Sequence, residues 1–160
     1  ALRSPQQETP ARSMRRRETS PDWNGLSDRT SFCTMTGNST FEYYNANRDG
    51  KNVGDCTVRA ISVALDQDWD TTYWGLCWEG YLAADMPSGN PVWGKYLRRK
   101  GWRRYLPEYE DITVQEFAHQ HHYGVYLLAL DTHIVCVFDG RIVDTWNSGG
   151  KTVLYYWMED

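Results

Sequence analysis

The spacing of apolar residues changes along the chain. Directly after Cys56 the apolar positions recur every three or four residues, which predicts a helix that begins at this cysteine. A second helical stretch is expected over about 71–84. A third helix is predicted to begin at Asn90, which serves as a cap before Pro91, and to end at Gly101.

A fourth, shorter helix is predicted from a capping pattern. Thr113 and Glu116 have the spacing at which each side chain bonds to the backbone of the other residue. This helix should run to about His121, before Gly124.

After Gly124 the pattern takes the two-residue period and the β-rich composition of strands. We expect these strands at about 125–130, 133–138, 141–147 and 152–158. The pair Asp139-Gly140 predicts a two-residue hairpin turn, because both central positions of that turn need positive φ. Helices followed by strands predict an α+β fold, with N-terminal helices packed on a C-terminal antiparallel β-sheet.

Residues 1–30 differ from the rest in composition and charge. They contain three prolines, almost no aliphatic residues, and six of the 17 basic residues against four acids. We therefore expect a flexible basic arm at 1–30 and one folded domain at 31–160. The net charge of the chain is -4, which leaves about -6 on the domain and argues against nucleic acid as a main ligand.

The apolar runs, the cysteines and the histidines indicate whether a membrane span or a metal site is to be expected. No apolar run reaches the roughly 20 residues of a membrane span, and no secretion signal is seen, so we expect a soluble protein without a membrane partner. The four cysteines form no C-x-x-C pair. His119 and His122 share a helical face, but no nearby acid or thiol completes a zinc site. We expect a surface histidine-rich helix end there, and neither metal nor cofactor.

Cys56 stands where a helix can activate a thiol. Unpaired N–H groups of the first turn and the positive end of the helix dipole stabilise a thiolate. Gly54 permits a tight approach of the chain, and Asn52 or Asp55 can supply a cap. The alternative interpretation is a small, buried and inert thiol at a helix start.

The hairpin predicted above would bring a histidine and an acid to one face. A two-residue turn pairs His133 with Trp146 and leaves Asp144 as the diagonal neighbour of His133. Diagonal backbones lie about 7 to 8 Å apart, so the carboxylate can reach an imidazole nitrogen. Trp146 can shield that bond from water. Asn147 falls on the opposite face and is a poorer candidate for the acid's position.

Five segments within about residues 44–157 carry a resemblance to a known family. They are NVGDCTVRA at 52–60, YLL at 126–128, THIV at 132–135, DG at 139–140 and DTW at 144–146. These segments resemble the small papain-like cysteine peptidases of bacteriophages and bacteria, and the order Cys, His, Asp-x-Trp is similar to the order Cys, His, Asn-x-Trp in papain.

The resemblance implies a peptidase or isopeptidase with Cys56 as nucleophile, His133 as its base and Asp144 orienting the histidine, acting on a protein or peptide through a thioester. Papain carries its oxyanion glutamine six residues before the cysteine, a position occupied here by Gly50. We expect the side chain of Asn52 to serve instead, aided by the backbone N–H of Cys56. Trp146 is expected to contact the substrate. A phage-encoded relative would act in the cytoplasm of its bacterial host.

Two other functions stay open at this point. The altered oxyanion position favours a binding module or effector that keeps the fold and has lost turnover. An amidase or deamidase would use the same three residues on cell-wall peptide or on a protein glutamine.

Overall fold

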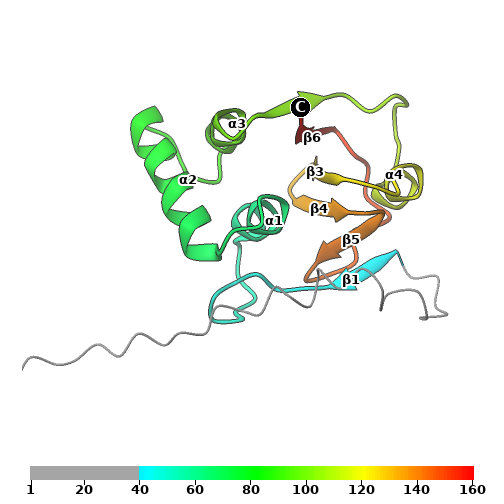
Figure 1. Ribbon diagram of the computed structural model, residues 1–160, viewed down its shortest axis with the longest axis horizontal. Helices are drawn as coiled ribbons and strands as arrows, with labels where there is room; N and C mark the ends of the chain where they lie inside the picture. Colours follow the sequence, from blue (N-terminus) through cyan, green and yellow to red (C-terminus); the bar gives the residue numbers. More distant parts are fainter. Residues whose placement is uncertain (1–39) are drawn as a thin grey trace, which may run out of the picture. The chain divides into compact units, whose positions relative to one another are not determined.

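The computed structural model describes residues 40–160, which form four helices and six strands (Figure 1). The helices are α1 (Cys56–Ala64), α2 (Trp69–Ala83), α3 (Asn90–Arg99) and α4 (Val114–Gln120). The strands are β1 (Phe41–Tyr43), β2 (Trp102–Tyr105), β3 (Val125–Ala129), β4 (Ile134–Phe138), β5 (Arg141–Asp144) and β6 (Tyr155–Glu159). The arm expected at 1–30 lies outside the described residues.

The helices begin close to their predicted positions. α1 begins at Cys56, as its pattern predicts. α3 begins at Asn90, but the expectation that Asn90 caps the helix was wrong, because Gly89 is the N-cap residue and Asn90 Oδ1 accepts a hydrogen bond from Trp93 Nε1 instead. The predicted capping box is present in α4, where the Thr113 side chain and the Glu116 side chain each bond to the other's backbone N–H. α2 begins two residues earlier than expected, because the side chain of Asp68 accepts a hydrogen bond from Thr71 N–H and caps the helix there.

The strands form one sheet in the order β1-β5-β4-β3-β6-β2. The expectation of a wholly antiparallel, C-terminal sheet was wrong. β1 precedes all the helices and pairs in parallel with β5, and β2 lies between α3 and α4 in the sequence and pairs with β6. β1 has three residues and β2 carries two central arginines, so neither strand shows a long apolar alternation. The class is α+β with a mixed sheet.

Helices cover both faces of this sheet (Figure 1). Leu127 and Ala129 of β3 belong to a buried cluster that also contains residues of α1, α2 and α3. Leu128, which points to the opposite face, packs in a second cluster with Phe117 of α4. Burying a Leu or Phe side chain contributes about 1.5–3 kcal/mol. The first cluster holds α1 against β4 at the centre of the sheet.

The β4–β5 hairpin has the predicted register. Phe138 pairs with Arg141, and Cys136 pairs with Val143. Asp139 and Gly140 both have positive φ, at 46° and 76°, as a two-residue turn of this type requires. β5 ends at Asp144, three residues earlier than expected.

The helices are also short or polar. Within residues 40–160, none combines the length and the apolar character that a membrane span requires.

Candidate active site

The cysteine of the site is the first residue of a helix. Cys56 opens α1 and is half-buried, so its thiol is neither sealed in the core nor fully exposed. Asp55 is the N-cap residue, but its side chain makes no capping hydrogen bond. The first-turn N–H groups and the positive end of the dipole therefore act on the thiol without a capping carboxylate between them.

The histidine and the acid come from the two arms of the hairpin. His133 directly precedes β4, and Asp144 is the last residue of β5. Their side chains meet with 2.5 Å between His133 Nε2 and Asp144 Oδ2. Asp144 is buried, and its second oxygen accepts a hydrogen bond of 2.7 Å from Thr145 N–H. The carboxylate is thus held by a backbone donor while it orients the imidazole.

The histidine also contacts the thiol. Because Asp144 occupies Nε2 of His133, Nδ1 is the ring nitrogen left for Cys56. Burial lowers the pKa of His133, but the hydrogen bonds and negative charges of Asp144 and Cys56 outweigh it and raise the pKa to about 9. The three side chains therefore form one connected group, with the imidazole in the middle.

The same contacts act on the thiol in the opposite direction. Burial raises the pKa of Cys56, but the hydrogen bond and positive charge of His133 and the Ile134 backbone N–H lower it below its usual value. A lowered thiol pKa next to a raised imidazole pKa favours transfer of the thiol proton to the imidazole, which gives a thiolate–imidazolium pair. Cys136 shows the contrast. It is fully buried in the sheet, and burial raises its pKa far above the ordinary range.

A buried arginine, Arg59, links the helix to the acid, and its role was not predicted from the sequence. Arg59, one turn after Cys56, is 5% exposed. One of its Nη atoms forms an ion pair with Asp55 and donates to the Val53 carbonyl oxygen at 3.2 Å. Its other Nη lies 3.9 Å from Asp144 Oδ1. The two nitrogens of one guanidinium therefore bridge the start of α1 and the end of β5.

Asp55 is the other centre of this polar network. Its Oδ2 accepts hydrogen bonds of 2.7 Å from Asn47 Nδ2 and 2.9 Å from Trp69 Nε1, and its Oδ1 pairs with Arg59. These partners explain why the Asp55 side chain does not cap α1. The sequence signal for the network was an arginine between apolar neighbours, four residues after an acid, on a helix face that the pattern assigns to the core.

Two further predicted site residues lie at the surface. The ring of Trp146 is 4.9 Å from the ring of His133, and 42% of the residue is exposed. It therefore covers one side of the imidazole and has surface free for a ligand. Asn52 is exposed in the loop before α1, and its role as an oxyanion donor stays a prediction.

The three histidines at the end of α4 lie in two different environments. The ring of His121 stacks on Phe117, with centroids 3.9 Å apart, and its Nδ1 is 2.9 Å from the Phe117 carbonyl oxygen. His119 and His122 are exposed. Among residues 40–160 no three His, Cys, Asp or Glu side chains are grouped as metal ligands would be.

The three side chains of the site come from one helix and from the two arms of one hairpin. A helix-borne cysteine faces a histidine and an aspartate carried by adjacent strands of a mixed sheet, and the imidazole joins the other two side chains. Comparisons with models of protein families, with curated proteins and with solved structures each give no match for this chain.

Proposed function

We propose that this chain is a papain-like cysteine hydrolase that cleaves a peptide or isopeptide bond. The observation that carries the proposal is the position of His133, which bonds to the buried Asp144 carboxylate through Nε2 and shares a hydrogen bond with the Cys56 thiol. A helix-start thiol, an imidazole and an orienting acid are the parts that acyl transfer through a thioester requires. A cytoplasmic location, where thiols stay reduced, is part of the proposal.

The reaction follows from these positions. The Cys56 thiolate attacks the carbonyl carbon of the scissile amide and forms a tetrahedral adduct with a negative oxygen. His133 gives its Nδ1 proton to the leaving nitrogen, the C–N bond breaks, and an amine departs from a thioester. A water molecule then loses a proton to His133 and attacks the thioester. The C–S bond breaks, the acid product leaves, and the thiolate–imidazolium pair is restored.

The charge of the adduct needs donors at the helix start. The backbone N–H of Cys56 belongs to the first turn of α1, where N–H groups have no partner within the helix. Asn52 is four residues earlier, and its side chain is the second donor of the proposal. The exposure of Trp146 beside His133 gives the substrate an aromatic surface next to the reacting atoms.

Selective thiol alkylation tests this proposal. A limiting amount of iodoacetamide at about pH 6 should label Cys56 first, because an ordinary thiol with a pKa near 8.5 is less than about 1% ionised there. His133→Ala should abolish the preference, whereas Cys136→Ser should leave it unchanged. Slow, equal labelling of all the cysteines in the unmodified chain would contradict the proposal. A peptide library and a glutamine-containing protein then separate peptidase from deamidase activity.

A binding module without turnover is the second candidate, and the exposure of Asn52 is the observation that favours it. A donor that is exposed in the free protein is not preorganised for a developing oxyanion. In that case Cys56 would still be alkylated rapidly, but no thioester would accumulate with an activated acyl probe. Mass spectrometry of the intact chain after exposure to the probe distinguishes the two functions.

A further inference from the structure

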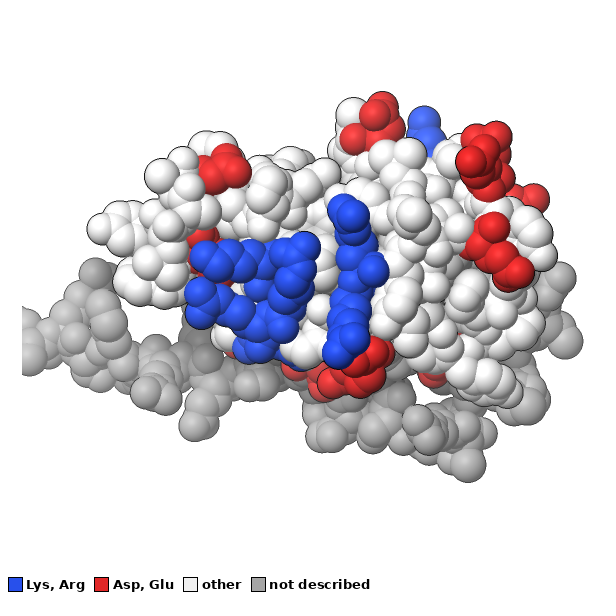
Figure 2. All heavy atoms as spheres, turned by 90° about the horizontal axis from the view of Figure 1, so that it is seen from above, with Lys and Arg blue, Asp and Glu red and all other residues white. Residues whose placement is uncertain are grey.

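A basic surface lies away from the three proposed catalytic residues. Six of the 17 Lys and Arg residues of the chain fall within residues 95–104, and this stretch contains no acid. In the structure they line the C-terminal part of α3 and the adjoining strand β2, and Figure 2 shows a group of blue side chains on one face. We call residues 95–104 the basic surface. Its members are Lys95, Arg98, Arg99, Lys100, Arg103 and Arg104.

Two carboxylates pair with three of these six cations. The Glu79 carboxylate forms ion pairs with Arg99 and Lys95, with nitrogen–oxygen distances of 2.7 Å and 3.7 Å. The Asp160 carboxylate pairs with Arg103 at 2.8 Å. Among residues 40–160 no carboxylate pairs with Arg98, Lys100 or Arg104. These three charges are therefore free to attract an anionic ligand.

The unpaired cations are held in place by aromatic rings. The guanidinium of Arg98 lies 5.2 Å from the ring of Trp157, and that of Arg104 lies 5.1 Å from the ring of Tyr155. Both rings belong to β6, the strand next to β2. Cation–π contacts of this kind limit side-chain motion, so less entropy is lost when a carboxylate binds the guanidinium.

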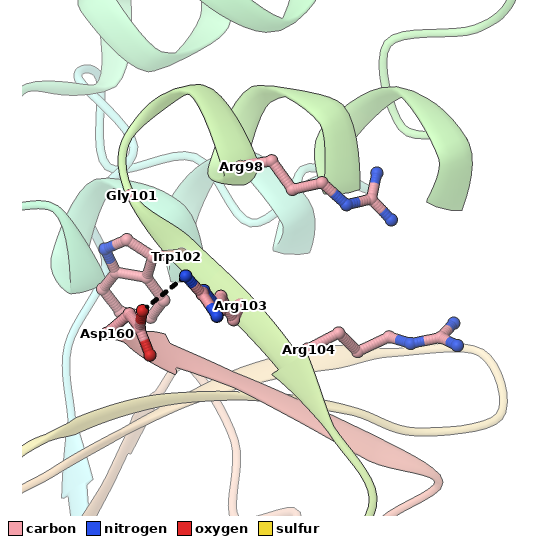
Figure 3. A pocket seen from close by; sticks show the side chains of 6 residues that line it. All are labelled: Arg98, Gly101, Trp102, Arg103, Arg104 and Asp160. Atoms are coloured by element: carbon pink, nitrogen blue, oxygen red, sulfur yellow. Dashed lines mark ion pairs between the residues drawn. The ribbon is translucent and has the colours of Figure 1, made fainter.

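The basic surface also contains a hollow. An open pocket of about 770 Å³ is lined by Arg98, Gly101, Trp102, Arg103, Arg104 and Asp160. In Figure 3 the side chains of Arg98 and Arg104 extend in the same direction, while Arg103 turns toward Asp160. Two guanidiniums that point the same way suit two carboxylates on one extended chain.

The strand beneath these arginines is at the edge of the sheet. β2 stands last in the strand order and pairs with β6 on one side. Within the described residues no strand pairs with its other side, so backbone N–H and C=O groups are available there to an added strand. Arg103 and Arg104 are successive residues of this strand, and their side chains point to opposite faces.

From the charges, the pocket and the free edge, we propose that the basic surface binds an acidic, extended polypeptide segment that pairs with the edge of β2 and places carboxylates on Arg98 and Arg104. Backbone pairing supplies affinity, and the arginines select acidic side chains. Single-stranded nucleic acid fits less well, because it binds through bases stacked on open aromatic faces, and here cations cover the rings of Trp157 and Tyr155.

A binding assay that does not depend on turnover tests the inference. The probe is a fluorescein-labelled peptide with blocked ends in which glutamate alternates with valine, and the full-length Cys56→Ser chain is titrated into it at low salt. We expect saturable binding by fluorescence anisotropy. The variant Arg98→Gln/Arg104→Gln should weaken binding at least about tenfold. The variant Lys51→Gln/Lys151→Gln removes two exposed charges elsewhere and should change it by less than about twofold.

Three outcomes would overturn the inference. One is equal binding by the two double variants, which would mean that only net charge matters. Another is undiminished binding of the same peptide after N-methylation of alternate backbone amides, which would exclude pairing with the strand edge. The last is tighter binding of single-stranded DNA with the same dependence on Arg98 and Arg104. All four mutated cations are exposed, so circular dichroism should show an unchanged fold. Because binding is measured without Cys56, failure here leaves the proposed hydrolase untouched.

Discussion

The bond between His133 and Asp144 makes the stability of the chain depend on pH in a predictable direction. The change to test is Asp144→Asn in a Cys56→Ser background, so that the thiol no longer titrates with the imidazole. With Cys56 present, the folded-state pKa of His133 lies at about 9, above its ordinary value of 6.5, and Asp144 supplies part of that rise. A group whose pKa is raised by folding stabilises the folded chain fully below its unfolded pKa, and loses that contribution as the pH rises through the folded value.

The size of the effect follows from the same shift. The rise in the pKa of His133 from 6.5 to about 9 corresponds to about 3 kcal/mol, and Asp144 and Cys56 share it. The hydrogen bond to Asp144 raises the pKa of His133 more than the hydrogen bond to Cys56 does. The charge of Asp144 likewise has a larger effect than the charge of Cys56. Asp144 therefore supplies at least half of the rise in the pKa of His133. Loss of this interaction in Asp144→Asn should lower the free energy of unfolding by about 2 kcal/mol near pH 6.

Urea denaturation of the two proteins at several pH values measures this difference. The loss of unfolding free energy caused by Asp144→Asn should be largest near about pH 6 and should shrink as the pH rises toward about 10. Asp131→Asn is the matched control, because Asp131 is an exposed acid in the turn before His133. It should produce no pH-dependent loss.

A loss from Asp144→Asn that stays the same at both ends of this pH range would refute the reasoning. Such a result would mean that the side chain contributes packing and neutral hydrogen bonds, with His133 uncharged in the folded state. A direct titration of the His133 ring by NMR provides the second measurement. Its midpoint should fall by at least about one unit in the Asp144→Asn variant.

Two further predictions concern the residues around the site. Arg59→Met leaves the Asp55 side chain without its cation and removes the second cation beside Asp144, so it should lower the free energy of unfolding by about 3–5 kcal/mol in urea denaturation and slow the alkylation of Cys56. Arg59→Lys should lose less stability, and equal stability of Arg59→Met and the parent would contradict the bridge. Asn52→Ala should lower kcat about a hundredfold on a cleaved peptide while leaving alkylation at its full rate, because it removes an oxyanion donor and not the activation of the thiol. An unchanged kcat would exclude Asn52 from that role.

The meeting of His133 and Asp144 could be predicted because a hairpin has few degrees of freedom. Once Asp139-Gly140 is assigned as a two-residue turn, the register and the alternation of faces determine which side chains are diagonal neighbours. The start of α1 at Cys56 could also be predicted from the sequence, since helical periodicity begins there. Both predictions rest on local rules that tertiary packing did not override.

Features that depend on partners distant in sequence were missed. β1 is a strand because it pairs with β5, about a hundred residues later, and three residues alone carry no period. The Asp55–Arg59 spacing was visible, but burial of the pair depends on Asn47 and Trp69 from other segments. The basic surface was hidden by the net charge of the chain, which averages a local cluster against acids spread over the remaining surface.

The buried Arg59 bears on both the fold and the proposed chemistry. Asp55 and Cys56 are adjacent, so the ion pair that fixes Asp55 also fixes the backbone from which the thiol projects. The same guanidinium lies near the Asp144 oxygen that His133 does not use. It therefore contacts the carboxylate without competing for the imidazole. Burial of an arginine is costly unless its partners are charged and well placed. Two carboxylates from different elements lie within ion-pair distance of this guanidinium, which links the position of the nucleophile to the acid that orients its base.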